Sequence, residues 1–309
     1  HILHIKSSYA WFTANQTVTV SQLQVNVKAS NGLQISADAQ SWKTILEKAD
    51  LETAGTAYNV LINQLPADNL EPVSTTGNVA AGKMDMFYGV AAANDDDGGN
   101  FYISSTKETD VTGTTGKYIA FDLFLKVDQD TTVYLSSNSK VTINGDTDLG
   151  LQNAARVAFV TEGSLTADKD PGDMRALALA TGTADIWEPN YDTHTAKGVA
   201  AARDTYGVTT TTTNGAKIPY FGIKDIIPVN TVPMKQSTTA NPNETYFDSV
   251  TTKWNTAAAN STNFEFGRLT AGVTKIRVYM WVEGQDVDCE NSASGATINF
   301  DLQFTTNNG

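Results

Sequence analysis

Three histidines are the residues of this chain best suited to binding a transition metal: His1, His4 and His194. Zinc-protease chemistry requires two imidazoles one helical turn apart with a glutamate base between them, the H-E-x-x-H arrangement. The sequence does not contain it, and His194 stands alone in the segment THTAK. These residues are therefore predicted to be structural or solvent-exposed, and the identity of any metal site stays open.

Three acidic runs are the second group that could bind an ion: NDDDGGN from Asn94, NGDTDLG from Asn144 and QDVDCE from Gln285. None has the D-x-[DN]-x-[DN]-G spacing with a distant glutamate that wraps calcium in an EF-hand. Adjacent carboxylates beside glycines are typical of solvated hairpin tips. We expect such tips and no cofactor, with a weak surface calcium site as the alternative.

Motifs for nucleophilic or nucleotide chemistry are missing as well. There is no G-x-S-x-G elbow, no P-loop and no G-x-G-x-x-G segment. The single cysteine, Cys289, cannot form an internal disulfide and is expected to be a small buried side chain. Trp42, Trp187 and Trp254 could form a sugar-binding face, although aromatic residues outside strands more often pin a loop to the core. The sequence thus predicts a protein that is not an enzyme.

Composition limits the possible partners. The chain has 309 residues, a formal net charge of −13 and a calculated pI of about 4.6. Phosphate binding needs a concentrated Lys/Arg face, and the 21 basic residues do not cluster, so we expect no nucleic-acid partner. The sequence has no apolar run of membrane length, and no membrane span is expected.

Period-two alternation of apolar residues predicts an all-β protein. Strands are expected at 18–27, 33–35, 84–90, 101–105, 118–127, 131–135, 155–160, 275–284 and 296–305. The alternation slips by one residue near Ser21 and Gln22, which predicts a β-bulge or a crossing between sheets. In 118–127 the odd positions form an apolar face, while Asp122 and Lys126 are expected to face solvent. The last two strands are expected to pair as antiparallel neighbours.

Two other segments differ from this pattern. Residues 41–48 place Trp42, Ile45 and Leu46 on one helical face, with Ser41 as a possible cap, and predict a short helix. Residues 162–263 are rich in Thr, Asn, Ala, Gly and Pro and are interpreted as a loop-rich insertion. The expected fold is an antiparallel, jelly-roll-like β-sandwich: one domain over 15–309, carrying the insertion 162–263, preceded by the segment 1–14.

Three blocks of sequence carry a family resemblance. They are SYAWFTANQTVTVSQLQVNVKAS from Ser8, KYIAFDLFLKVDQDTTVYLSS from Lys117 with NAARVAFV from Asn153, and KIRVYMWVEGQDVDCE from Lys275 with INFDLQFT from Ile298. Together they resemble the TasA/camelysin-like, fibre-forming proteins that Gram-positive bacteria secrete with a SipW-type signal peptide. The chain departs from that pattern in the segment HILHIK before the expected cleavage point after Ala10, and in the insertion 162–263.

The resemblance implies a secreted, cell-surface protein that polymerises with copies of itself, as a biofilm matrix fibre or a pilus-like filament. Polymerisation would use donor-strand complementation, in which the N-terminal strand of one subunit completes a sheet of the next. The alternatives are a cell-surface adhesin or carbohydrate-binding protein, or a camelysin-like metallopeptidase. The segment 1–14 is rich in apolar residues at a terminus, and its predicted subunit-interface residues are Ile2, Leu3, Ile5, Tyr9, Trp11 and Phe12. The alternative for this segment is that it folds back as an edge strand of its own sheet.

Overall fold

The structure is a computed structural model that describes residues 11, 17–28, 32–66, 68–93, 101–145, 147–201, 217–234, 243–289 and 293–307. The all-β prediction is confirmed, because strands dominate these residues and the helices among them are short. The helices are α1 (Lys48–Thr53), α2 (Gly55–Tyr58), α3 (Pro171–Arg175), α4 (Ala196–Ala201) and the 3-10 turn η1 (Leu151–Ala154).

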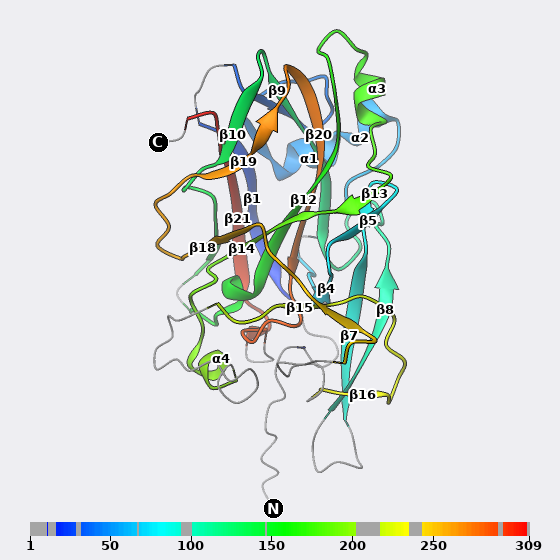
Figure 1. Ribbon diagram of the computed structural model, residues 1–309, viewed down its shortest axis with the longest axis vertical. Coiled ribbons are helices and arrows are strands. Elements are labelled where there is room, and N and C mark those ends of the chain that lie inside the picture. The colour runs from blue at the N-terminus through cyan, green and yellow to red at the C-terminus, as the bar shows by residue number, and fades with distance from the viewer. Residues whose placement is uncertain are drawn as a thin grey trace, which may run out of the picture.

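Two six-stranded sheets form the body of the molecule (Figure 1). The first follows the order β19 (Phe264–Leu269), β10 (Thr131–Leu135), β21 (Thr297–Thr305), β1 (Thr19–Val27) and β3 (Ile45–Glu47), with β11 (Lys140–Ile143) also paired to β21. The second follows the order β18 (Trp254–Thr256), β14 (Asp185–Pro189), β12 (Ala155–Leu165), β20 (Gly272–Val282), β9 (Ile119–Val127) and β2 (Gln34–Ser36).

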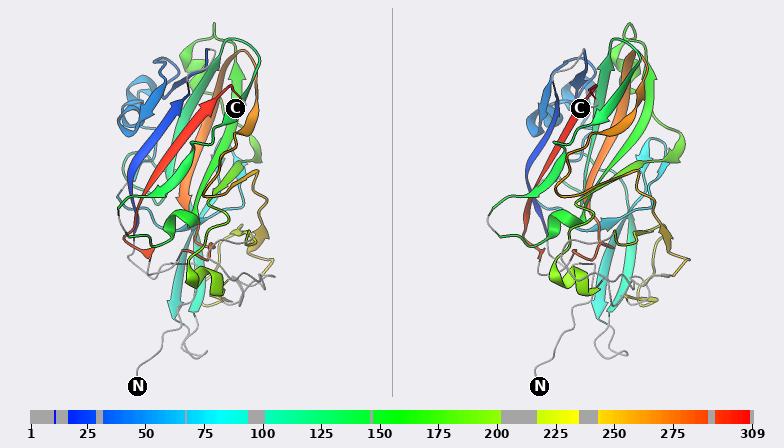
Figure 2. Two further views of the ribbon diagram at one scale, coloured as in Figure 1. Left: turned by 90° about the vertical axis from the view of Figure 1, so that its left-hand side faces the viewer. Right: turned by 60° about the vertical axis from the view of Figure 1, so that its left-hand side comes forward.

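The inward faces of the two sheets share one apolar core, so they form a sandwich. Phe300 and Phe304 come from β21 of the first sheet, whereas Phe121, Phe159 and Ile276 come from the second, and all belong to one buried cluster. In the left view of Figure 2, β1 in blue and β21 in red lie side by side in the first sheet, which faces the viewer. The sandwich is not purely antiparallel, because β1 pairs with β21 in parallel and β14 pairs with β18 in parallel.

The predicted irregularity in the first strand is confirmed. The register of β1 against β21 shifts between Val20 and Gln22, where one residue of β1 has no partner. The bulge restores the inward direction for the apolar residues on both sides of it. Val20, Leu23 and Val25 are accordingly all buried.

The predicted pairing of the last two strands is wrong. β20 pairs with β9 and β12 in the second sheet, whereas β21 pairs with β1, β10 and β11 in the first. The segment 283–296 between them is therefore a crossing from one layer to the other. Every position of β20 is buried, as expected for a central strand that is covered on both faces.

Half of the prediction for the strand 119–127 is also wrong. Its odd positions face the core as expected, but Asp122 is only 4% exposed and Phe124 is fully buried. A third layer covers the outer face of the second sheet, formed in part by α2, α3 and the small sheet β13 (Thr181–Thr183), β5 (Asn78–Ala80) and β6 (Lys83–Met84). Asp122 is neutralised there by Arg277 at 2.9 Å.

The helix predicted over 41–48 is wrong as well. Residues 45–47 form β3, in which Ile45 is 49% exposed and Leu46 is 1% exposed, and this strand pairs with β1. The helix begins only at Lys48, where Glu47 and Asp50 form a reciprocal capping box. Leu46 faces the core because side chains alternate along the strand. In so short a segment, a buried Leu46 fits a helical pattern equally well, so the sequence does not distinguish the two.

Residues 162–263 contribute directly to the sandwich. β12 continues to Leu165 beside β20, and β14 and β18 extend the second sheet. The remaining strands lie in a sheet of β16 (Val232–Pro233), β8 (Phe101–Glu108), β7 (Met86–Ala93) and β4 (Val73–Ser74), and in the pair β15 (Phe221–Ile223) and β17 (Phe247–Ser249).

Among the described residues, no helix is long and apolar enough to cross a membrane.

An aromatic cluster across the two sheets provides a test of the sandwich. Phe159 of β12 makes edge contacts with Trp254, Phe266 and Phe304 at centroid distances of 5.9, 5.2 and 6.2 Å. We expect Phe159→Ala to lower the free energy of unfolding by about 3–5 kcal/mol in urea titrations, because it leaves a cavity between the layers. The half-buried Phe264, on the same strand as Phe266, is the control, and an equal loss for Phe264→Ala would contradict this packing.

Candidate functional site

Trp11 is the described residue nearest the N-terminus, and its side chain is only 1% exposed. The indole lies against two glycines, Gly89 of β7 and Gly284 in the segment after β20. A Cβ atom at Gly284 would lie 2.3 Å from a ring carbon of Trp11, and one at Gly89 would lie 2.8 Å away. Both distances are shorter than van der Waals contact, so only glycine leaves room for the ring. We call this site the Trp11 slot and define it by Gly89, Gly284 and Gln285.

Gln285 provides the polar contact of the Trp11 slot. The indole Nε1 donates a buried hydrogen bond to Gln285 Oε1 at 2.9 Å, which satisfies the only polar atom of the ring. The apolar surroundings come from several elements around β7 and β8, and the buried members of this cluster are Phe87, Ala91, Ile103, Ile223, Ile227, Val232, Met234 and Phe247. The slot therefore binds both the apolar and the polar part of the indole.

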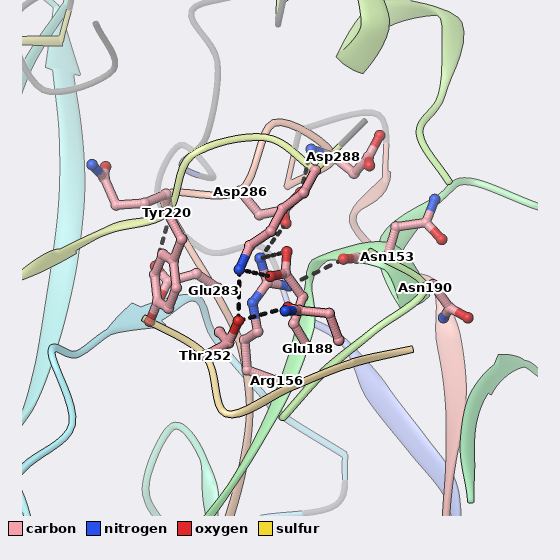
Figure 3. A network of polar contacts seen from close by, with 12 residues as sticks. Asn153, Arg156, Glu188, Asn190, Tyr220, Thr252, Glu283, Asp286 and Asp288 are labelled. Carbon is pink, nitrogen blue, oxygen red and sulfur yellow. Dashed lines mark hydrogen bonds and ion pairs between the residues drawn. The ribbon is translucent and has the colours of Figure 1, made fainter. Parts of the chain in front are cut away.

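The segment that carries Gly284 and Gln285 is held by the buried guanidinium of Arg156 (Figure 3). Arg156 Nη2 donates to Glu188 Oε1 at 2.9 Å and to Asp286 Oδ2 at 2.7 Å. Its Nη1 donates to the carbonyl oxygens of Asn153 and Ala155. One cation thereby joins β12, the end of β14 and the segment after β20.

Glu283 fixes the beginning of the same segment. Its Oε1 accepts a hydrogen bond from the Tyr220 hydroxyl at 2.6 Å, and its Oε2 accepts one from the backbone N–H of Gln285 at 2.9 Å. The backbone N–H of Gly284 donates to the Val73 carbonyl. Burial raises the pKa of Glu283 to about 7, despite these stabilising hydrogen bonds.

His194 and Asp288 close the other end of the network. His194 Nδ1 lies 2.9 Å from Asp288 Oδ2, and Asp288 Oδ1 accepts hydrogen bonds from the backbone and the hydroxyl of Thr195. Burial acts to lower the pKa of His194, but the hydrogen bond to Asp288 and the nearby negative charges outweigh it and raise that pKa. The histidine is thus a buried structural group paired with a carboxylate.

Of the predicted subunit-interface residues, the structure describes Trp11, which is buried against its own chain. The others lie outside the described residues, as do His1, His4 and the acidic run 94–100. The run from Gln285 is not a solvated hairpin tip, because Asp286 and Asp288 are 8% and 1% exposed. No group of three or more His, Cys, Asp or Glu side chains in the described part of the chain is arranged to hold a metal ion.

The tryptophans and the cysteine can also be placed. Trp187 and Trp254 are 0% and 4% exposed and belong to the central core, so they pin chain segments and present no sugar-binding face. Trp42 is half-buried, with Lys126 Nζ 4.4 Å from its ring centre. Cys289 is fully buried, as expected.

Sequence reasoning missed Arg156 and the two slot glycines. Arg156 interrupts the apolar segment AARVAFV. This position could have indicated a buried ion pair, because a charge within a buried strand needs a partner. Gly89 and Gly284 give no comparable signal. Glycine is also common in turns, so its presence in the sequence does not show that it contacts an aromatic ring.

A double-mutant cycle tests the Trp11 slot. We expect Trp11→Ala and Gly284→Ala each to lower the free energy of unfolding by about 2–5 kcal/mol, the first by removing the indole and the second by displacing it. The double variant should lose less than the sum, because Trp11→Ala removes the ring with which the methyl group added by Gly284→Ala clashes. Gly267→Ala in β19, where an added Cβ meets nothing within 4 Å, is the control. Strictly additive losses would contradict the contact.

The raised pKa of Glu283 gives a pH prediction. Between its ordinary pKa of 4.5 in the unfolded chain and about 7 in the folded chain, the folded state binds more protons, so this group lowers stability as pH rises. In Glu283→Gln, the decline of unfolding free energy over this range should be shallower than in the parent. Urea titrations at several pH values measure it, with the exposed Glu52→Gln as control. Identical pH profiles for parent and Glu283→Gln would contradict the raised pKa.

Comparison with known proteins found no matching family model, no matching curated protein and no matching solved structure.

Proposed function

We propose that this chain is the structural subunit of an extracellular filament, a biofilm matrix fibre or a pilus-like polymer, and that its role is not catalytic. The observation that carries the proposal is the Trp11 slot. In the sequence, an apolar N-terminal segment precedes Trp11, and the indole of Trp11 fits a site made of two glycines and a glutamine. In this proposal the segment 1–14 is the donor strand, with Ile2, Leu3, Ile5, Tyr9 and Phe12 as further interface residues.

Strand exchange is physically reasonable for such a segment. A contact between a terminal segment and its own chain can form equally well between that segment and a neighbouring copy, as in domain swapping. Each large apolar side chain that a donor strand buries would contribute about 1.5–3 kcal/mol. The relation is head to tail, so it propagates into an open filament unless the rotation closes a ring.

The fold is compatible with this role. We propose that the sandwich is jelly-roll-like and that the protein is secreted to the cell surface, as the family resemblance implies. The two six-stranded sheets end in edge strands, β19 and β3 in one and β18 and β2 in the other. Edge strands carry unpaired backbone groups, to which an added strand can bind by β-augmentation.

Deletion of residues 1–12 tests the proposal. The truncated chain should stay monomeric in sedimentation and electron microscopy under conditions in which the full chain forms filaments. Added to intact subunits, it should shorten the filaments, because it still accepts a donor but has none to give. Truncated protein that forms filaments of normal length and morphology would exclude donor-strand complementation.

A second variant separates loss of the donor strand from loss of the Trp11 anchor. Replacing Ile2, Leu3 and Ile5 by serine leaves Trp11 and its slot intact. We expect this variant to unfold at the same urea concentration as the full chain but to form no filaments. If it polymerises normally, the apolar residues before Trp11 are not the donor.

A further inference from the structure

A small cavity lies within the buried network, beside the Trp11 slot. Its volume is about 10 Å³, and the polar part of its wall comes from Arg156, Glu188, His194, Tyr220, Gln285 and Asp286. Ile218, Pro219 and Val287 form the rest of the wall. A cavity of about 10–15 Å³ is the smallest that holds one water molecule.

Three buried polar atoms on the side chains around this cavity have no hydrogen-bond partner: Arg156 Nε, Glu188 Oε2 and His194 Nε2. All three side chains are more than nine-tenths buried, at 2%, 3% and 5% exposed. Lys217 Nζ lies 3.7 Å from Glu188 Oε2, beyond hydrogen-bond distance. Leaving a polar atom unpaired in the interior costs about 1–3 kcal/mol, and more for a charged group. Three such atoms on side chains that line one cavity therefore indicate a missing partner.

We propose that this cavity binds a single water molecule, which bridges Arg156, Glu188 and His194. The chemistry of the three atoms defines the ligand. Arg156 Nε–H can only donate, and Glu188 Oε2, which has an ion pair with Lys217 but no hydrogen bond, accepts. Because a carboxylate only accepts, Nδ1 of neutral His194 carries the proton and donates the hydrogen bond to Asp288, which leaves Nε2 as an acceptor. The ligand must accept one hydrogen bond and donate two, which one water molecule does.

Other small ligands fail on the same grounds. A halide accepts hydrogen bonds but donates none, and it would lie beside the carboxylate of Glu188. A metal ion would bind Glu188 and His194 but would lie against the N–H of a guanidinium, which is always protonated. When His194 is protonated, water still fits, since it then accepts from Arg156 and His194 and donates to Glu188.

The bridging water joins three parts of the chain: β12, the segment from Glu188 to His194, and, through the Arg156–Asp286 ion pair, the segment after β20. Gln285, which accepts the hydrogen bond from Trp11, lies in the wall of the same cavity. The water thus belongs to the support of the Trp11 slot.

A crystal structure of the full chain, at a resolution that shows ordered water, tests the proposal. One peak with the density of water should lie within about 3.2 Å of Arg156 Nε, Glu188 Oε2 and His194 Nε2. An empty cavity, or direct hydrogen bonds among the three side chains, would overturn it. A bromide soak that gives an anomalous peak at this position would identify a halide site, and a peak after a zinc or calcium soak would identify a metal site. Either result would also overturn it.

The tautomer of His194 is an independent readout in solution. In ¹⁵N-labelled protein at alkaline pH, the neutral ring should carry its proton on Nδ1 and leave Nε2 unprotonated. Asp288→Asn with the same label is the matched comparison, because it removes the carboxylate that fixes this tautomer. A neutral His194 that is protonated on Nε2 in the parent would contradict the assigned donors and acceptors.

Discussion

The buried charge of Arg156 is the constraint on which this end of the molecule depends. Moving an ion out of water costs several kcal/mol, so a guanidinium that is 2% exposed must have carboxylates within hydrogen-bond distance. Glu188 and Asp286 supply them from segments that are 32 and 130 residues away in the sequence. The ion pairs thereby fix the segment after β20, and that segment presents Gly284 and Gln285 to Trp11.

A second buried arginine has the same role on the outer face of the second sheet. Arg277 binds Asp110 and Asp122, each at 2.9 Å, and the hydroxyls of Tyr118 and Tyr279 also donate to Asp110. Asp110 belongs to the covering layer and Asp122 to β9, so the ion pairs attach that layer to the sheet. Charges as well as apolar side chains therefore hold the layers of this protein together.

The sequence was sufficient to predict several strands, such as 118–127 and 155–160, and an irregularity near Ser21, which the structure shows to be a bulge. It was not sufficient to predict which layer a strand joins, because the alternation of Ile276, Val278 and Met280 shows which face of β20 points inward but not which strands lie beside it. Asp122 was assigned to solvent because its partner, Arg277, lies 155 residues away. The Trp11 slot was missed for the same reason, since Trp11 and Gln285 are 274 residues apart and neither position indicates the other.

The parallel pairing of β1 with β21 has a consequence for the order of folding. Thr19 lies opposite Thr297 and Val27 opposite Phe304, so these two central strands of one sheet are far apart in the sequence. During synthesis, β1 can pair at once with β3, but β21 emerges much later, and the first sheet cannot close until β21 has left the ribosome. Pairings this distant in sequence also form slowly. The chain thus has a long interval in which the edge of β1 that later binds β21 has no partner, and during that interval the first sheet is held only by local pairings such as β1 with β3.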